Sequence, residues 1–294
     1  MTGKCIFNGK IINSENLTLD KLTRGFLYGD GIFETMRSQE YKIFRFPDYL
    51  ERLLNSVKSV NLSLPFSPDE IQMQIENFLR LLKIPDTYIR LTLWRKQPDS
   101  FDPLTEMGSN YLVTVRPLVK IPTVLYKKGI SCMIEKKFRK NEFSPISHIK
   151  SLSFLENVLY RQQAHLSETK ETILLNTSGF LAEASVSNIF FIKNNIIFTP
   201  SVSCGIVPGI MRKTVLEITK DLGIEIKQGK YKSSEIKKAD EVFLTNTLIE
   251  VLPVTKIDDV RINNGKIGKL TKLISKEIIK RYFSKKCYNK KPIL

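Results

Sequence analysis

One lysine in this sequence occupies a position that suits chemistry at a side-chain amine. Lys150 lies between a predicted strand end, residues 145–149, and a predicted helix. The helix is indicated by apolar residues at helical spacing, namely Leu155, Val158, Leu159 and Leu166. A lysine held between rigid elements can be desolvated, which lowers its pKa and lets it act as a nucleophile and proton carrier. In a lysine-rich chain a solvent-facing lysine is the simpler interpretation, and this stretch alone favours it.

Three other stretches place polar groups at the ends of predicted elements. Glu183 follows a predicted strand, where an isolated carboxylate is usually only solvated. Residues 207–212 enter a predicted helix, whose free N–H groups are a natural phosphate seat, although most helix starts bind nothing. The glycine-rich run 24–35 allows a close backbone approach, but its spacing fits neither the P-loop nor the dinucleotide pattern.

The length and composition are those of an ordinary globular protein. A chain of 294 residues with 42% hydrophobic residues can bury a large core, and two domains are expected. The start of the chain lacks an apolar segment long enough for a signal peptide, and no uncharged run is long enough to span a bilayer. We therefore expect a cytoplasmic protein.

The cysteines and the charge exclude some sites and leave others open. Four scattered cysteines and two histidines show no metal-type spacing, so we expect neither a metal site nor a disulfide framework. The net charge of +16 favours an anionic partner, either nucleic acid or a phosphorylated or carboxylated small molecule. No zinc-finger spacing or aromatic RNA-binding signature accompanies the charge, so nucleic-acid binding is the weaker alternative.

Local patterns predict alternating strands and helices in two domains. Hairpins are expected at 5–12 around Asn8-Gly9, at 173–182 and at 189–198. Helices are expected at 47–60, 68–82, from about 210 to 222 and from about 270 to 282. Strands at 88–94 and 111–115 are joined by the polar residues 95–110, a connection long enough to serve as a lid. The proline-containing residues 116–122 are the expected linker between an N-terminal domain, 1–117, and a C-terminal domain, 122–294.

Several short motifs follow one another from about residue 5 to residue 280. They are Tyr28-Gly29-Asp30-Gly31-Ile32-Phe33-Glu34-Thr35, Glu51-Arg52-Leu53, Ile149-Lys150-Ser151-Leu152, Glu183 with Ser187-Asn188-Ile189-Phe190, Pro208-Gly209-Ile210, and Thr247 with Glu250-Val251-Leu252-Pro253-Val254. In this order and spacing they resemble the class IV aminotransferases, which are pyridoxal 5'-phosphate (PLP) enzymes of fold type IV. The resemblance implies a homodimeric two-domain α/β (α+β) fold, with a small N-terminal α+β domain and a larger β-barrel-like C-terminal domain that carries the PLP lysine.

The resemblance also implies roles for residues that would hold the cofactor. Lys150 would form the Schiff base with PLP and then shuttle protons. Glu183 matches the carboxylate that pairs with the pyridine nitrogen. Arg52, the backbone N–H groups of Ile210 and Met211, and Thr247 match the phosphate cup.

Further roles concern the substrate. Arg37, Arg90 and Arg95 match positions on the substrate side, where an arginine fork suits a carboxylate. Thr35 is expected to join Lys150 as a catalytic residue. The expected partner is therefore a small amino substrate that bears a carboxylate.

The subfamily is open between a lyase and a transaminase. Thr35 and Met211 resemble 4-amino-4-deoxychorismate lyase, which releases pyruvate and leaves 4-aminobenzoate for folate synthesis. Phe154 lacks the tyrosine hydroxyl of branched-chain transaminases, and residues 95–110 lack the Arg-x-His carboxylate trap of D-amino-acid transaminases. Thr247 and Glu250 resemble transaminases instead. We expect the lyase, with an amino-acid transaminase that uses 2-oxoglutarate as the alternative.

Overall fold

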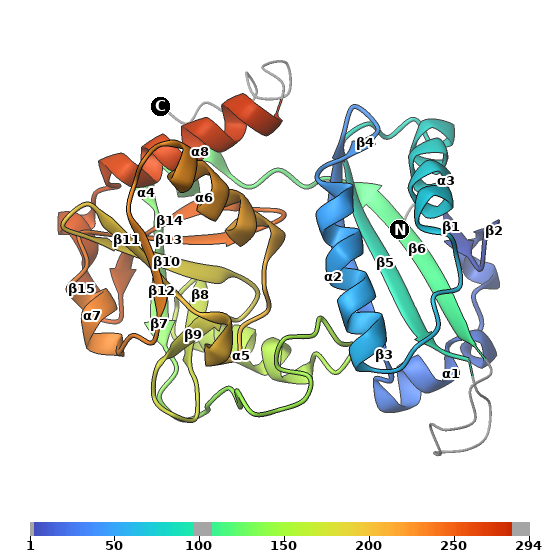
Figure 1. Ribbon diagram of the computed structural model, residues 1–294, viewed down its shortest axis with the longest axis horizontal. Helices are drawn as coiled ribbons and strands as arrows, with labels where there is room; N and C mark the ends of the chain where they lie inside the picture. The colour runs from blue at the N-terminus through green and yellow to red at the C-terminus, as the bar shows by residue number, and fades with distance from the viewer. Residues whose placement is uncertain (1–2, 97–107, 284–294) are drawn as a thin grey trace. The chain divides into compact units, whose positions relative to one another are not determined.

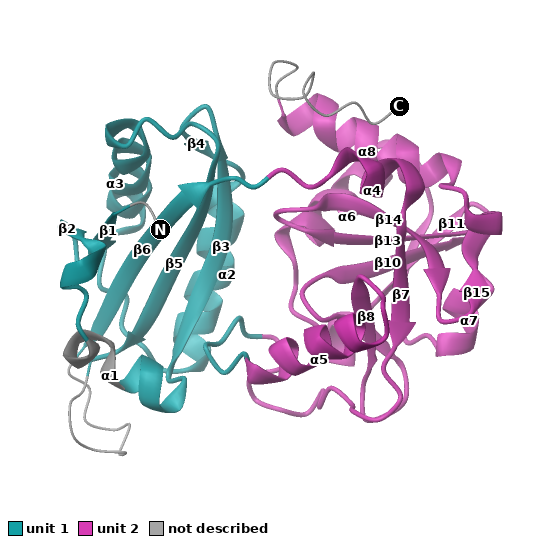
Figure 2. Cartoon of the chain, turned by 180° about the vertical axis from the view of Figure 1, so that it is seen from behind, with its two compact units in different colours: residues 1–119, 149–154 teal, residues 120–148, 155–294 magenta. Residues whose placement is uncertain are grey.

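The computed structural model describes residues 3–96 and 108–283. The chain forms two compact units, coloured separately in Figure 2. Unit 1 comprises Met1–Val119 and Ile149–Phe154, and unit 2 comprises Lys120–His148 and Leu155–Leu294. The boundary falls inside the predicted linker.

An antiparallel sheet organises unit 1 (Figure 1), with the strand order β2-β1-β6-β5-β3-β4. Its strands are β1 (Lys4–Phe7), β2 (Lys10–Asn13), β3 (Gly31–Gln39), β4 (Lys42–Ile43), β5 (Thr87–Arg95) and β6 (Ser109–Pro117). The helices are α1 (Leu19–Tyr28), α2 (Phe46–Ser59) and α3 (Pro68–Leu81), preceded by the short 3-10 helix η1 (Ser14–Asn16). Both α2 and α3 begin with a proline in the first turn, where its missing N–H costs no helical hydrogen bond.

The two faces of this sheet differ because side chains alternate along each strand. On β5, Ile89 and Leu91 are buried, whereas Arg90 between them is only half-buried. Arg90 lies opposite Thr35 on β3 and opposite Thr114 on β6. These three residues therefore share one open face, while the other face is buried and is covered in part by α2 (Figure 2).

The segment 149–154 pairs with the start of β3, although it is distant in sequence. The Phe33 N–H donates to Lys150 O at 2.8 Å, and the Leu152 N–H donates to Gly31 O at 2.9 Å. Lys150 therefore groups with unit 1, whereas we expected the C-terminal domain to carry it. The expected strand end at 145–149 is wrong, because these residues form turns and a bend. The isolated bridge to Ile32 is made by Ser151, after this stretch.

Two glycines permit this pairing. Gly29 ends α1 in the left-handed conformation at φ 63°, and a Cβ there would lie 2.7 Å from Ser153 Oγ. A Cβ at Gly31 would overlap the Leu93 carbonyl oxygen. The glycine-rich run therefore serves a close approach between backbones, as its composition predicts.

A second, curled sheet organises unit 2, with the order β12-β11-β10-β13-β14-β7-β8-β9 and with β15 paired to β14. Its strands are β7 (Ile130–Ile134), β8 (Glu171–Leu175), β9 (Leu181–Ala184), β10 (Asn188–Lys193), β11 (Ile196–Pro200), β12 (Ile226–Gly229), β13 (Glu241–Asn246), β14 (Glu250–Ile257) and β15 (Val260–Arg261). The end strand β9 curls back against β10 and β11, and this agrees with the expected barrel-like form. Apolar side chains such as Ile173, Leu181 and Leu244 fill the interior.

Helices surround the sheet of unit 2 (Figure 1). They are α4 (Thr123–Lys128), α5 (Leu155–Leu166), α6 (Ile210–Asp221), α7 (Ser233–Lys237) and α8 (Lys269–Tyr282), with the short 3-10 helices η2 (Val202–Cys204) and η3 (Ile262–Gly265). In residues 3–96 and 108–283 no helix has the length and apolar character needed to cross a membrane.

Most of the predicted elements are confirmed. The three hairpins form as β1–β2, β8–β9 and β10–β11, and the five predicted helices form as α2, α3, α5, α6 and α8. Helix α1 was not predicted. The predicted lid, 95–110, falls largely on residues outside those that the structure describes.

Candidate active site

Lys150 lies against an aromatic wall in unit 1. Its Nζ is 4.4 Å from the centroid of the Phe33 ring and 5.9 Å from that of Phe154. The two rings meet edge to face at 5.5 Å. An ammonium over a ring face is stabilised by the ring's quadrupole, so the predicted nucleophile has a defined position on the open face of the sheet.

Arg90 approaches the same phenylalanine. Its Cζ lies 3.6 Å from the centroid of the Phe33 ring, and its Nε donates to Thr92 Oγ1 at 3.3 Å. Thr35 is the cross-strand neighbour of Arg90. Arg37, two residues further along β3, lies on the same face and is buried. The structure thus brings Lys150, Thr35, Arg37 and Arg90 to one sheet face, as a shared site requires.

Arg52 belongs to the other face. It lies on α2 and forms a bidentate pair with Glu34, in which Nε donates to Oε1 at 2.8 Å and Nη2 donates to Oε2 at 2.6 Å. The side chains are 10% and 2% exposed. Glu34 alternates with Phe33 and Thr35 along β3, so its carboxylate points to the helix-covered side. Glu34 holds the predicted phosphate ligand in a fixed orientation.

Arg95 has contacts that fix the end of β5. Its Nε donates to Asp30 Oδ2 at 3.1 Å, while Nη1 and Nη2 donate to the carbonyl oxygens of Asn61 and Val60. Asp30 is also paired with Arg24 at 2.7 Å. These contacts make Arg95 a structural residue of unit 1, and its role toward a substrate carboxylate stays a prediction.

Glu183 is buried in unit 2 and lies on β9, not after a strand as we expected. Its Oε1 forms an ion pair with Lys140, and its Oε2 accepts the Val207 N–H at 3.0 Å and the Asn188 Nδ2 at 3.3 Å. Arg212 is a second cation nearby. Burial lowers the pKa of Arg212 to about 10, and the charge of Glu183 acts in the opposite direction.

The start of helix α6, which follows Val207 and Pro208, packs closely against Asn188. Helix α6 begins at Ile210, and Gly209 before it provides no side-chain cap. A Cβ at Gly209 would overlap Asn188 Oδ1, so the position has room for glycine alone. The side chains of Ile210 and Met211 are buried, which means that only their backbone groups can serve an anion at this end of α6.

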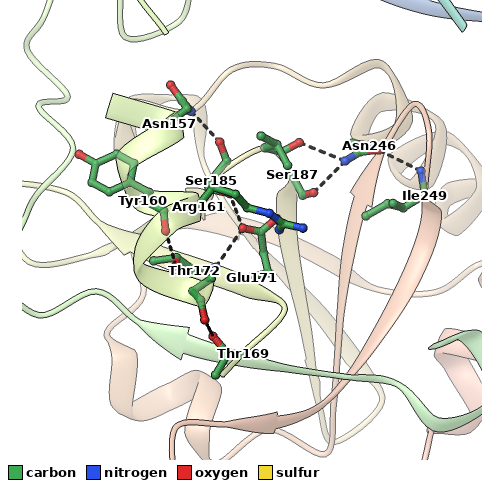
Figure 3. Close-up of polar contacts among 12 residues, drawn as sticks. Asn157, Tyr160, Arg161, Thr169, Glu171, Thr172, Ser185, Ser187, Asn246 and Ile249 are labelled. Carbon is green, nitrogen blue, oxygen red and sulfur yellow. Dashed lines mark hydrogen bonds and ion pairs between the residues drawn. The ribbon is translucent and has the colours of Figure 1, made fainter. Parts of the chain in front are cut away.

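Thr247 lies in the turn between β13 and β14, where it is half-buried. Asn246 organises this turn by accepting the N–H groups of Leu248 and Ile249 at 2.8 and 2.9 Å. The Asn246 side chain also donates to Ser187 Oγ at 3.0 Å (Figure 3). The turn that carries Thr247 is therefore tied to the segment that follows Glu183.

The segment after Glu183 is held from its other side by a buried carboxylate. Glu171 accepts the hydroxyl of Ser185 and pairs with Arg161 at 3.0 Å (Figure 3). Asn157 donates to the Ser185 carbonyl at 2.6 Å. Helix α5, the end of β9 and the β13–β14 turn thus form one polar network.

Sequence reasoning missed four residues of these networks, namely Lys140, Asn188, Glu171 and Asn246. Asn188 lies within the motif Ser187-Asn188-Ile189-Phe190, and Asn246 immediately precedes the predicted phosphate ligand Thr247. Lys140 and Glu171 carry no local signal, because the carboxylate and hydroxyl that they contact are 43 and 14 residues away.

Comparison with known proteins agrees with this geometry. The sequence profile of the family described as amino-transferase class IV matches residues 31–257. The aminodeoxychorismate lyase of Bacillus subtilis is 30% identical over 284 residues, which cover 95% of this chain and 96% of the relative. The D-alanine aminotransferase of Bacillus licheniformis is 30% identical over 270 residues, with 92% and 93% covered.

A solved structure extends the likeness to the fold. The branched-chain aminotransferase from the archaeon Thermoproteus uzoniensis, solved with norvaline, has a TM-score of 0.87 and 26% identity, over 97% of this chain and 97% of that chain. The chain belongs to the class IV aminotransferases, and it is a PLP-dependent aminotransferase or lyase.

The described residues have the donor set that PLP needs. An amine for the aldehyde is present in Lys150, and a buried carboxylate for the ring nitrogen is present in Glu183. A phosphate needs N–H donors and a cation, and the uncapped start of α6 and Arg52 supply groups of these kinds. On these grounds the residues fit the cofactor of the family.

Proposed function

We propose that this chain is a 4-amino-4-deoxychorismate lyase, which forms 4-aminobenzoate and pyruvate. The observation that carries the proposal is the position of Thr35, whose side chain lies on the same open sheet face as Lys150 and Arg90. A hydroxyl at this point can donate to an ether oxygen that leaves as a bond breaks. An amino-acid transamination has no such leaving group.

The predicted site residues have separate roles toward the cofactor. Lys150 would bind PLP covalently, and Glu183 would pair with the ring nitrogen. Arg52, the Ile210 and Met211 N–H groups and Thr247 would hold the phosphate. Bound PLP supplies an electron sink for the carbon that carries the substrate amine. The Lys150 amine, when free, would remove the proton from that carbon.

The substrate end of the site uses the open face of unit 1. Arg90 and Arg37 bind carboxylate groups of the substrate, because a guanidinium can donate to both oxygens of a carboxylate. Thr35 donates to the ether oxygen as its bond to the ring breaks. The enolpyruvate that leaves takes up a proton to become pyruvate, and the ring becomes aromatic.

The test supplies aminodeoxychorismate in one assay and amino acids with 2-oxoglutarate in another, and measures pyruvate and glutamate. We expect pyruvate and 4-aminobenzoate, with Thr35→Val slowing their release about 100-fold and Thr35→Ser slowing it less, as is typical for the loss of a proton donor. Glutamate formed at enzyme-like rates with no pyruvate would overturn the lyase proposal.

An amino-acid transaminase is the second candidate, and the burial of Met211 favours it. Met211 is one of two residues that resemble the lyases, yet its side chain is 1% exposed in the core of unit 2 and offers a substrate nothing but its backbone. Thr247 and Glu250 resemble transaminases. Glutamate formation in the second assay would select this candidate.

The alternative of a nucleic-acid-binding protein without catalysis is set aside, because the chain is a PLP-dependent aminotransferase or lyase. Purified protein should be yellow from PLP bound at Lys150, and Lys150→Ala should lose the covalent linkage. A Lys150→Ala variant that keeps the covalent linkage would overturn the role of Lys150. We also propose that the enzyme acts in the cytoplasm.

We also propose that the chain forms a homodimer through α5. The apolar residues of this helix face outward, since Leu155, Val158, Leu159 and Leu166 are 70%, 56%, 44% and 71% exposed. The buried residues of α5 are Tyr160 and Ala164. An apolar helical stripe of this kind suits a protein interface. Light scattering should give twice the chain mass, and Leu159→Glu should shift it toward the monomer.

A further inference from the structure

Lys140 places a cation directly against the buried carboxylate of Glu183. The Lys140 ammonium forms an ion pair with Glu183 Oε1, and the two side chains are 14% and 7% exposed. The neighbouring Arg139 points elsewhere, because its Nη1 donates to backbone carbonyl oxygens that include that of Glu135. Of the two adjacent cations, Lys140 is therefore the one that meets Glu183.

The backbone holds Lys140 on both sides. Its N–H donates to Leu175 O at 2.9 Å, and its carbonyl accepts the Thr177 N–H at 3.1 Å. Two residues later, Glu142 accepts the hydroxyl and N–H groups of Thr177 and Ser178. A side chain on such an anchored segment keeps its contact without the entropy cost of a free surface lysine.

A contribution to folding stability does not explain well why Lys140 and Glu183 are paired. Two buried charges lose their hydration, and apolar residues of the same size often stabilise a protein as much or more. The pair is better explained by what it does to Glu183.

The donors around Glu183 leave room for a ligand. An ionised carboxylate offers about four lone-pair sites. In the described structure three donors reach it, namely the Lys140 ammonium, the Val207 N–H and the Asn188 amide. The remaining site suits one more N–H donor, which is what a protonated ring nitrogen provides.

We propose that Lys140 is a positioning residue that weakens the hold of Glu183 on the proton of the PLP ring nitrogen. The proposal rests on the proposed role of Glu183. The positive charge of Lys140 offsets part of the carboxylate charge and repels a protonated ring, so the ring proton is held less firmly than by Glu183 alone. Lys140 thereby sets the electron demand of the cofactor without touching it.

The experiment measures the ring nitrogen itself. Holoenzyme is reconstituted with PLP labelled with ¹⁵N in the ring, and its ¹⁵N chemical shift is recorded at one fixed pH. Lys140→Met should move the resonance upfield, toward a fully protonated ring, and Lys140→Arg should restore the parent value. The matched control is Lys237→Met, which removes a half-buried lysine paired with Asp258 at 2.7 Å. It should leave the resonance unchanged.

The outcomes separate this proposal from the one on which it rests. A Lys140→Met resonance that is unchanged or moves downfield overturns the role of Lys140, provided that Glu183→Gln moves the resonance downfield. If Glu183→Gln leaves the resonance in place, Glu183 is not the partner of the ring nitrogen and both roles fail. Thermal unfolding of each variant shows that the fold is intact, and Lys140→Arg tests the charge should Lys140→Met not fold.

Discussion

Removal of either partner of the Arg52–Glu34 pair should strongly destabilise unit 1. Glu34 is 2% exposed and receives two hydrogen bonds from Arg52, at 2.8 and 2.6 Å. Arg52→Ala leaves this carboxylate buried and without those two donors. Breaking a buried pair in this way costs about 3–5 kcal/mol.

Urea unfolding measures this cost locally. Trp94, the sole tryptophan of the chain, is buried on β5, so its fluorescence reports on unit 1. With a slope of about 2 kcal/mol/M in urea, a loss of this size lowers the midpoint by roughly 2 M. Replacing both partners by apolar residues, as in Arg52→Met with Glu34→Leu, should recover much of the loss because no buried charge then remains unpaired.

An exposed arginine of the same unit serves as the control. Arg80 is 44% exposed and lies 3.7 Å from Glu76, which keeps Lys42 as a partner at 2.7 Å. Surface pairs of this kind contribute about 0–1 kcal/mol, so Arg80→Ala should shift the midpoint little. Equal shifts for Arg52→Ala and Arg80→Ala would refute the reasoning.

Two further predictions concern unit 2. Gly209→Ala should reduce PLP retention at least tenfold in equilibrium dialysis, because the added Cβ displaces the Asn188 amide that donates to Glu183; retention at the parent level would show that the helix start tolerates a side chain. Desolvation raises the pKa of Glu142, but hydrogen bonds from Ser178 and Thr177 outweigh it and lower the pKa from 4.5 to about 2. Glu142→Gln should therefore remove a pH-dependent contribution to the free energy of unfolding. A lowered pKa stabilises above pH 4.5 and loses its effect as the pH falls toward 2, so the thermal midpoints of parent and variant should converge over that window; a constant difference would contradict this.

Local sequence was sufficient to predict most of the elements, because they are set by short-range physics. The alternation of Ile89, Arg90 and Leu91 predicts a strand with one buried face, and β5 has that face. Asn8-Gly9 predicts the first hairpin, and both residues have positive φ in the structure. Periodicity also predicts α5, but the same pattern cannot say whether an apolar stripe faces its own core or another chain.

The residues around Glu183 could not be predicted in the same way. Lys140 and Glu183 meet only because β8 and β9 form a hairpin whose turn is held against the Lys140 segment. Nothing near either residue in sequence specifies that contact. A long-range ion pair of this kind depends on the register of the sheet, which local propensity leaves open.

Consecutive residues of β3 belong to one sequence motif but have different roles. Phe33 and Thr35 lie on the open face with Lys150 and Arg90, whereas Glu34 between them faces α2 and holds Arg52. The motif is short in sequence, yet the strand's alternation divides it between two surfaces. One surface can contact a substrate, and the other fixes the arginine that the phosphate would need. Substitution of Thr35 should therefore alter catalysis with little loss of stability. Substitution of Glu34 should impair both catalysis and stability, because Glu34 holds Arg52 and is buried.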